Sequence, residues 1–144
     1  PIYASLIVNQ VKSPEAKHLS KLPVRKFMQK EVICFNADTT LEDAREQIKK
    51  YNHKTYPVQS SKNKLLGLIT KADIEDAMFQ GVCDKTELNK LMNPSPVTIE
   101  PNENLYIAYF RLHSNNAKCL VVVDKNNKIK GIITREDINK ANEC

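Results

Sequence analysis

The residues best suited to bind a ligand occur twice, as a threonine followed three positions later by an aspartate. They are Thr70 with Asp73 and Thr134 with Asp137. Each threonine ends an apolar run and begins a helical pattern, so a hydroxyl, a carboxylate and free backbone N–H groups should gather at one helix N-terminus. Such a terminus suits a phosphate, and a carboxylate beside it can accept hydrogen bonds from a ribose diol. The pattern favours a nucleoside phosphate over a sugar or an amino acid.

A purely structural interpretation stays open. Thr-x-x-Asp at a helix start is also what a capping box needs, with Asp in place of Glu. In that case Gly67 and Gly131, which precede the threonines, only let the strand turn or approach a neighbour closely.

The surrounding stretch is repeated. Residues 67–74 (GLITKADI) return as 131–138 (GIITREDI), an offset of 131 − 67 = 64. At this offset, residues 24–77 and 88–141 share 15 identities in 54 positions. The chain is therefore two copies of a unit of about 55 residues, a size at which one core is marginal, so we expect the copies to share a core.

Hydrophobic periodicity predicts β-α-β-β-α in each copy and an α+β fold. In the first copy we expect strands at 32–35, 56–58 and 65–69, and a helix that a Thr39–Glu42 capping box begins. Its core face would be Leu41, Ala44 and Ile48.

In the second copy a helix at 102–115 would bury Leu105, Ala108, Tyr109 and Leu112. We expect an N-terminal arm at 1–22, the first copy at 23–81 and the second at 82–144, with a linker near 81–86.

Composition excludes several classes. The net charge of +5 is scattered through both copies and aromatic interleaving is absent, which disfavours a nucleic-acid site. No apolar run is long enough to span a membrane. The cysteines (Cys34, Cys83, Cys119 and Cys144) form no C-x-x-C pair, which favours a reducing compartment and no metal site. No catalytic residue set or P-loop is evident, so we expect no enzyme activity of the chain itself.

The doubled G-h-h-T-x-x-D motif, with an intervening Pro57-Val58 strand, resembles the cystathionine-β-synthase (CBS) domain. Two in tandem resemble the regulatory pair called a Bateman module. The resemblance implies two copies packed sheet to sheet about a pseudo-twofold axis, clefts that bind AMP, ADP or ATP, and a homodimer formed through the helices. From the residues themselves we expect no cofactor and no metal.

The resemblance also implies two sets of ligand-binding residues. The first cleft would use Val32, Ile33, His53, Lys54, Tyr56, Thr134 and Asp137. The second would use Thr70, Asp73, Val97, Ala117 and Lys118. We expect the first cleft to be the better occupied, because Pro94 and Pro96 flank the strand of the second and proline lacks an N–H.

The start of the chain, Pro1-Ile2-Tyr3-x-x-Leu6, is similar to the segment after the last membrane helix of ClC-type chloride channels and transporters. This resemblance implies a regulatory domain at the cytosolic face of a membrane, attached to the transmembrane domain of the same polypeptide. Two alternatives stay open: a structural dimerisation module with empty clefts, and the regulatory part of a soluble enzyme such as an inosine-monophosphate dehydrogenase or a sugar-phosphate isomerase.

Overall fold

The computed structural model describes residues 14–143, which form two compact units. Of the described residues, unit 1 contains 14–30, 97–124 and 130–143. Unit 2 contains 31–96 and 125–129. Neither unit is one continuous stretch of chain. The segment Pro1-Ile2-Tyr3-x-x-Leu6, which resembles part of a ClC-type channel, lies outside the described residues.

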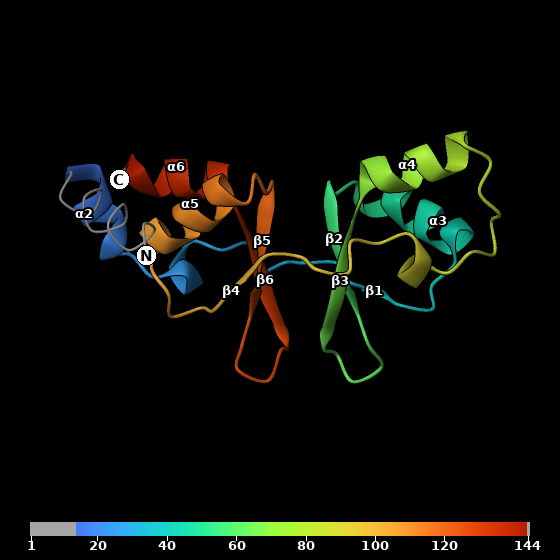
Figure 1. Ribbon diagram of the computed structural model, residues 1–144, viewed down its shortest axis with the longest axis horizontal. Helices are drawn as coiled ribbons and strands as arrows, with labels where there is room; N and C mark the ends of the chain where they lie inside the picture. The colour runs from blue at the N-terminus through green and yellow to red at the C-terminus, as the bar shows by residue number, and fades with distance from the viewer. Residues whose placement is uncertain (1–13, 144) are drawn as a thin grey trace. The chain divides into compact units, whose positions relative to one another are not determined.

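Unit 2 is a small sheet with helices beside it (Figure 1). Its elements are β1 (Phe35–Asn36), α3 (Leu41–Tyr51), β2 (Thr55–Gln59), β3 (Leu65–Thr70), α4 (Lys71–Phe79) and a 3-10 turn η2 (Leu88–Lys90). The strand order is β1-β2-β3, with β1 parallel to β2 and β2 antiparallel to β3. The short turn between β2 and β3 explains their antiparallel pairing.

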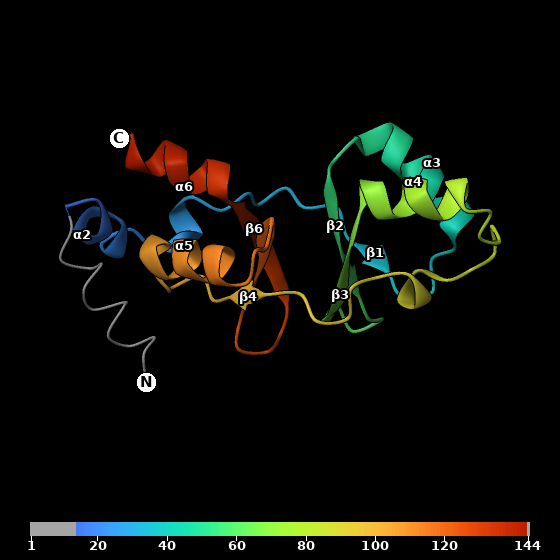
Figure 2. The ribbon, with the colours of Figure 1, turned by 45° about the horizontal axis from the view of Figure 1, so that its top comes forward.

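Unit 1 repeats this plan and adds a helix. Its elements are α2 (Pro14–Ser20), a 3-10 turn η1 (Val24–Lys26), β4 (Thr98–Ile99), α5 (Leu105–Ser114), β5 (Cys119–Val123), β6 (Ile129–Thr134) and α6 (Arg135–Asn142). The strand order is β4-β5-β6, and β4 runs parallel to β5. Helix α2 lies near α5 and α6 and packs against both (Figure 2).

The predicted α+β class and the β-α-β-β-α order of each copy are confirmed, whereas two boundaries are wrong. The first strand begins at Phe35 and not at Val32, because only Phe35 and Asn36 pair with β2. The cap of α3 is Thr40 and not Thr39: the Thr40 hydroxyl accepts from Asp43 N–H at 3.3 Å. The Thr39 carbonyl is occupied by Leu88 N–H at 2.9 Å.

Each unit contains its own cluster of buried apolar residues. In α3 the predicted core face is confirmed, with Leu41, Ala44 and Ile48 all buried. In α5, Leu105, Ala108 and Leu112 are also buried as expected.

The inclusion of Tyr109 on the core face of α5 is wrong. Its neighbour Tyr106 is buried instead, and Tyr109 is 40% exposed. The ring of Tyr109 stacks on the exposed His113 at a centroid distance of 6.1 Å, along the outside of the helix.

Each unit is completed by a segment from the start of the other copy. We call residues 22–29 and 86–93 the leader segments. In unit 1, Leu105 N–H donates to Leu22 O at 2.9 Å and Val24 N–H to Glu103 O at 2.8 Å. In unit 2 the equivalent bonds are Leu41 N–H to Thr86 O at 2.8 Å and Leu88 N–H to Thr39 O at 2.9 Å.

Each leader segment then pairs with a strand at the motif glycine. Gln29 and Ile132 exchange two backbone hydrogen bonds of 2.8 and 3.0 Å in unit 1, and Asn93 and Leu68 exchange two of 2.8 and 2.9 Å in unit 2. A Cβ at Gly131 would lie 2.6 Å from Gln29 O, and one at Gly67 would lie 2.7 Å from Asn93 O. Both distances are impossible for real atoms, so the glycines permit a close approach, as the structural interpretation of the motif predicted.

We therefore expect Gly67→Ala and Gly131→Ala to lower the free energy of unfolding by about 1–3 kcal/mol each, because the new methyl group must displace a backbone carbonyl. Denaturant unfolding followed by circular dichroism measures this. Gly81→Asn is the comparison: Gly81 has a φ of 79°, and a Cβ at this position would meet no atom within 4 Å, so this variant tests backbone strain without a steric clash. A full-stability Gly131→Ala variant would contradict the close approach.

Candidate functional site

The two helix starts singled out in the sequence form capping boxes. At α6, Thr134 Oγ1 accepts from Asp137 N–H at 3.4 Å, and Asp137 Oδ2 accepts from Thr134 N–H at 2.9 Å and from its hydroxyl at 3.0 Å. At α4, Asp73 N–H donates to Thr70 Oγ1 and Thr70 N–H donates to Asp73 Oδ2, both at 3.0 Å. The capping geometry is confirmed, and it fixes the position of each carboxylate relative to its helix start.

The two aspartates differ in their surroundings. The side-chain amide of Gln29 donates to both carboxylate oxygens of Asp137, at 3.1 and 3.4 Å, and Asp137 is half-buried. Asn93 holds the position equivalent to Gln29, since 29 + 64 = 93, but its Oδ1 accepts from Ser95 N–H at 3.0 Å. Asp73 is exposed and, within residues 14–143, accepts only its own cap bond.

Sequence reasoning missed Gln29. The residue lies in a leader segment, and its contact with Asp137 depends on the pairing of that segment with β6. No periodicity or motif marks it. The available signal is the Met28–Met92 identity beside it, which places Gln29 opposite Asn93 in the repeat.

In unit 2 the structure brings Lys54 to the start of α4. The Lys54 carbonyl accepts from Lys71 N–H at 2.9 Å, so Lys54 lies next to Thr70. The Lys71 ammonium donates to the Asn52 side chain at 2.9 Å. Lys54 and Thr70, which were predicted to line different clefts, both belong to unit 2, and their assignment to separate clefts stays a prediction.

His53 and Tyr56 also lie together in unit 2. Tyr56 is fully buried, its ring stacks on Phe35 at 4.8 Å, and its hydroxyl accepts from His53 N–H at 2.8 Å. Burial raises the pKa of Tyr56, and the bond from His53 acts in the opposite direction. The ring of His53 is half-buried at 6.0 Å from that of Tyr56. Tyr56 is therefore a core residue in unit 2.

The remaining predicted residues lie beside the sheets. Val32 and Ile33 are half-buried just before β1. In unit 1, Val97 accepts from Val121 N–H at 3.1 Å through its carbonyl, Ala117 N–H donates to Leu112 O at 2.9 Å, and Lys118 is exposed. Thr134, Asp137, Val97, Ala117 and Lys118 thus belong to unit 1, and the other predicted site residues to unit 2.

Within residues 14–143, no group of three or more His, Cys, Asp or Glu side chains could hold a metal ion. None of the described helices combines the length and the apolar character that crossing a membrane requires.

The profile of the CBS domain family matches residues 24–80 and 87–143. The chain belongs to this family and carries two tandem CBS domains.

Two curated relatives illustrate the range of proteins with a similar sequence. A CBS domain-containing protein of Dictyostelium discoideum is 30% identical over 129 residues, covering 82% of this chain and 89% of the relative. A homoserine O-acetyltransferase of Methanosalsum zhilinae is 32% identical over 123 residues, covering 85% of this chain but 24% of the relative. The chain thus spans about a quarter of the length of the first curated relatives it matches.

Among solved structures, CBSX2 in complex with AMP has a TM-score of 0.73 at 25% identity, covering 83% of this chain and 95% of that one. The CBS pair of protein MJ0100 with 5′-methylthioadenosine and S-adenosyl-L-methionine has a TM-score of 0.72 at 25% identity, covering 82% and 93%. The CBS domain of a bacterial CNNM/CorC family Mg²⁺ transporter with ATP has a TM-score of 0.79 at 20% identity, covering 90% and 92%, and shows the shared fold.

We expect Thr134→Val to lower the free energy of unfolding by about 0.5–2 kcal/mol, because valine keeps the shape but removes the hydroxyl that caps α6. Thr134→Ser keeps a hydroxyl and should retain most of the stability. Thermal unfolding of the two variants measures the difference. Equal loss in both would show that the methyl group, and not the cap, stabilises this position.

Proposed function

We propose that the chain is a non-catalytic regulatory module that binds an adenine nucleotide: AMP, ADP or ATP. The observation that carries the proposal is the duplicated Thr-x-x-Asp helix start in a tandem CBS pair. Proteins of the same fold at 25% identity hold AMP or adenosyl ligands. The backbone N–H groups and the carboxylate at each helix start suit a phosphate and a ribose diol.

In this proposal Thr134 and Thr70 contact phosphate, and Asp137 and Asp73 accept from the ribose hydroxyls. The remaining predicted ligand-binding residues are Val32, Ile33, His53 and Lys54 for the first set, with Tyr56 shaping its wall from the core, and Val97, Ala117 and Lys118 for the second. Exposed Lys54 and Lys118 add positive charge for a phosphate.

The module would act by linkage. A nucleotide that binds two arrangements of the protein with different affinity shifts their populations by that difference, and an attached domain responds. The ATP-bound domain of the CNNM/CorC family transporter is an example of a CBS domain from a membrane protein. Attachment of this chain to a ClC-type channel at the cytosolic face of a membrane stays a prediction, which the comparisons do not support. Nucleotide titration distinguishes the proposed function from an empty structural module. The full-length sequence distinguishes a membrane-attached regulatory domain from the regulatory part of a soluble enzyme.

We expect millimolar AMP, ADP or ATP to raise the melting temperature, because a ligand that binds only the folded state stabilises it by mass action. Asp137→Ala should lose the part of the increase in melting temperature that comes from its site. The increase is measured relative to the same variant without nucleotide, so that the stability lost with the helix cap does not enter the comparison. Asp38→Ala removes an exposed carboxylate of unit 2 and serves as the control. Absence of a shift with all three nucleotides would reject the proposal and leave the structural module.

We also propose a homodimer formed through the helices. Phe79, at the end of α4, is 93% exposed, and packing between the helices of two chains would bury its ring. Phe79→Lys should shift the protein toward monomer in sedimentation velocity. Leu66→Lys, at a 41% exposed position on β3, should leave the assembly unchanged. A wild-type chain that is monomeric at high micromolar concentration would exclude this dimer.

A further inference from the structure

The two aspartates of the helix starts differ in how many hydrogen bonds the protein itself donates to them. Asp137 accepts four: Oδ2 accepts from Thr134 N–H, from the Thr134 hydroxyl and from the Gln29 amide, and Oδ1 accepts from the same amide. Among the described residues, Asp73 accepts one, from Thr70 N–H. A carboxylate offers about four acceptor positions. Those of Asp137 are therefore filled from within unit 1, whereas most of those of Asp73 are open to a donor from outside.

The side chain of Gln29 is kept beside Asp137 by its own backbone. Gln29 and Ile132 exchange two backbone hydrogen bonds of 2.8 and 3.0 Å, and Ile132 lies two residues before the threonine that caps α6. The amide then donates to both carboxylate oxygens, at 3.1 and 3.4 Å. Because the backbone pairing holds one end of this side chain in place, a ligand that donates to Asp137 must compete with a donor tethered at the site.

In unit 2 the equivalent side chain has another partner. Asn93 pairs with Leu68 through two equivalent backbone bonds, but its Oδ1 accepts from Ser95 N–H at 3.0 Å. An asparagine that accepts from the backbone two residues further on forms an Asx turn, and Pro94 provides the backbone angle that a turn favours at the next position. The Asn93 side chain is thus used within its own leader segment and not at Asp73.

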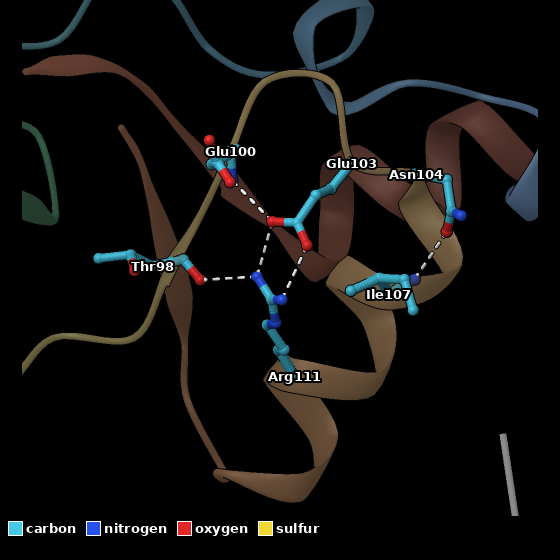
Figure 3. A network of polar contacts seen from close by, with 6 residues as sticks. All are labelled: Thr98, Glu100, Glu103, Asn104, Ile107 and Arg111. Atoms are coloured by element: carbon cyan, nitrogen blue, oxygen red, sulfur yellow. Dashed lines mark hydrogen bonds and ion pairs between the residues drawn. The ribbon is translucent and has the colours of Figure 1, made fainter. Parts of the chain in front are cut away.

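Another carboxylate of unit 1 illustrates the role of one whose acceptors are filled from within (Figure 3). Glu103 accepts from both terminal nitrogens of Arg111 and from Glu100 N–H, all at 2.8 Å. Arg111 also donates to the Thr98 carbonyl at 3.1 Å. These bonds tie α5 to β4, so the role of this carboxylate is structural. The carboxylate of Asp137 is filled in the same way, and it ties α6 to a leader segment.

A ribose diol brings two O–H donors to a carboxylate. At Asp73 both can be accepted without the loss of a hydrogen bond within the protein. At Asp137 they can be accepted only after the Gln29 amide has left, and the free energy of its hydrogen bonds is then lost from the free energy of binding.

We propose that Gln29 competes with the ribose of a nucleotide for Asp137, so that the start of α4 binds an adenine nucleotide more tightly than the start of α6. This inference rests on the proposed function and assigns the difference between its two sites to one residue. The order is opposite to the sequence-based expectation, in which Pro94 and Pro96 make the set that contains Asp73 the less occupied one.

Nuclear magnetic resonance titration of the wild-type chain with AMP measures the two sites separately. The amide shifts of Lys71 and Asp73 report the start of α4, and those of Arg135 and Asp137 report the start of α6. The α4 shifts should saturate at an AMP concentration that is lower by about threefold or more. Equal saturation, or saturation of α6 first, would overturn the inference and leave the proposed function standing. No shift at either helix start would reject both.

A variant without the amide tests the role of Gln29 directly. Gln29→Ala should tighten AMP binding at the start of α6 by about threefold or more and leave the start of α4 unchanged. Asn102→Ala is the control and should bind AMP like the wild type, because Asn102 is an exposed amide of unit 1 that accepts from Arg25 of the same leader segment at 3.2 Å. Weaker binding in Gln29→Ala would show that the amide orients Asp137 for the ribose, which overturns the competition.

A ligand without the diol separates competition for the carboxylate from other effects of the substitution. The dideoxy analogue of AMP keeps the adenine and the phosphate but has no ribose hydroxyl that could donate to Asp137. Gln29→Ala should therefore leave the affinity of this analogue at the start of α6 unchanged. An equal gain for AMP and for the analogue would show that Gln29 acts through the shape of the site, and would overturn the inference.

Discussion

The structure depends on a backbone pairing that only glycine permits. Each leader segment exchanges two hydrogen bonds with a strand, at Gln29 with Ile132 and at Asn93 with Leu68. The carbonyl of the leader lies where the first side-chain carbon of Gly131 or Gly67 would be. A buried strand whose backbone groups lacked these partners would carry a large desolvation cost. The glycines of the motif therefore hold each unit together, and the threonine and aspartate that follow are placed by the strand so paired.

Much of the fold could be predicted because the repeat and the side-chain pattern carry it. The α+β class, the element order and the core face of α3 follow from periodicity, since burial selects apolar residues at helical spacing. Four asparagines that recur between the copies also reflect the local backbone conformation. Asn52 and Asn116, and Asn63 and Asn127, are identical between the copies and all have positive φ, a conformation that asparagine tolerates better than most residues.

The rest could not be predicted because it rests on backbone contacts between distant segments. The exchange of the leaders uses N–H and carbonyl groups, which any residue carries, so no residue type marks it. The contact of Gln29 with Asp137 depends on that exchange. The N-cap of α3 is Thr40 and not the expected Thr39. Leu88 of the leader segment donates to the Thr39 carbonyl, and this backbone contact is not marked by any residue type. In the candidate site, the capping boxes were predictable and the difference between the two aspartates was not.

The exchanged leaders make each copy depend on the other. A copy standing alone would lack the segment that pairs with its β3 or β6, because that segment belongs to the other copy. It could regain these hydrogen bonds only from a second molecule, so an isolated half of this chain would pair with another half, whereas the tandem chain satisfies both leaders within itself.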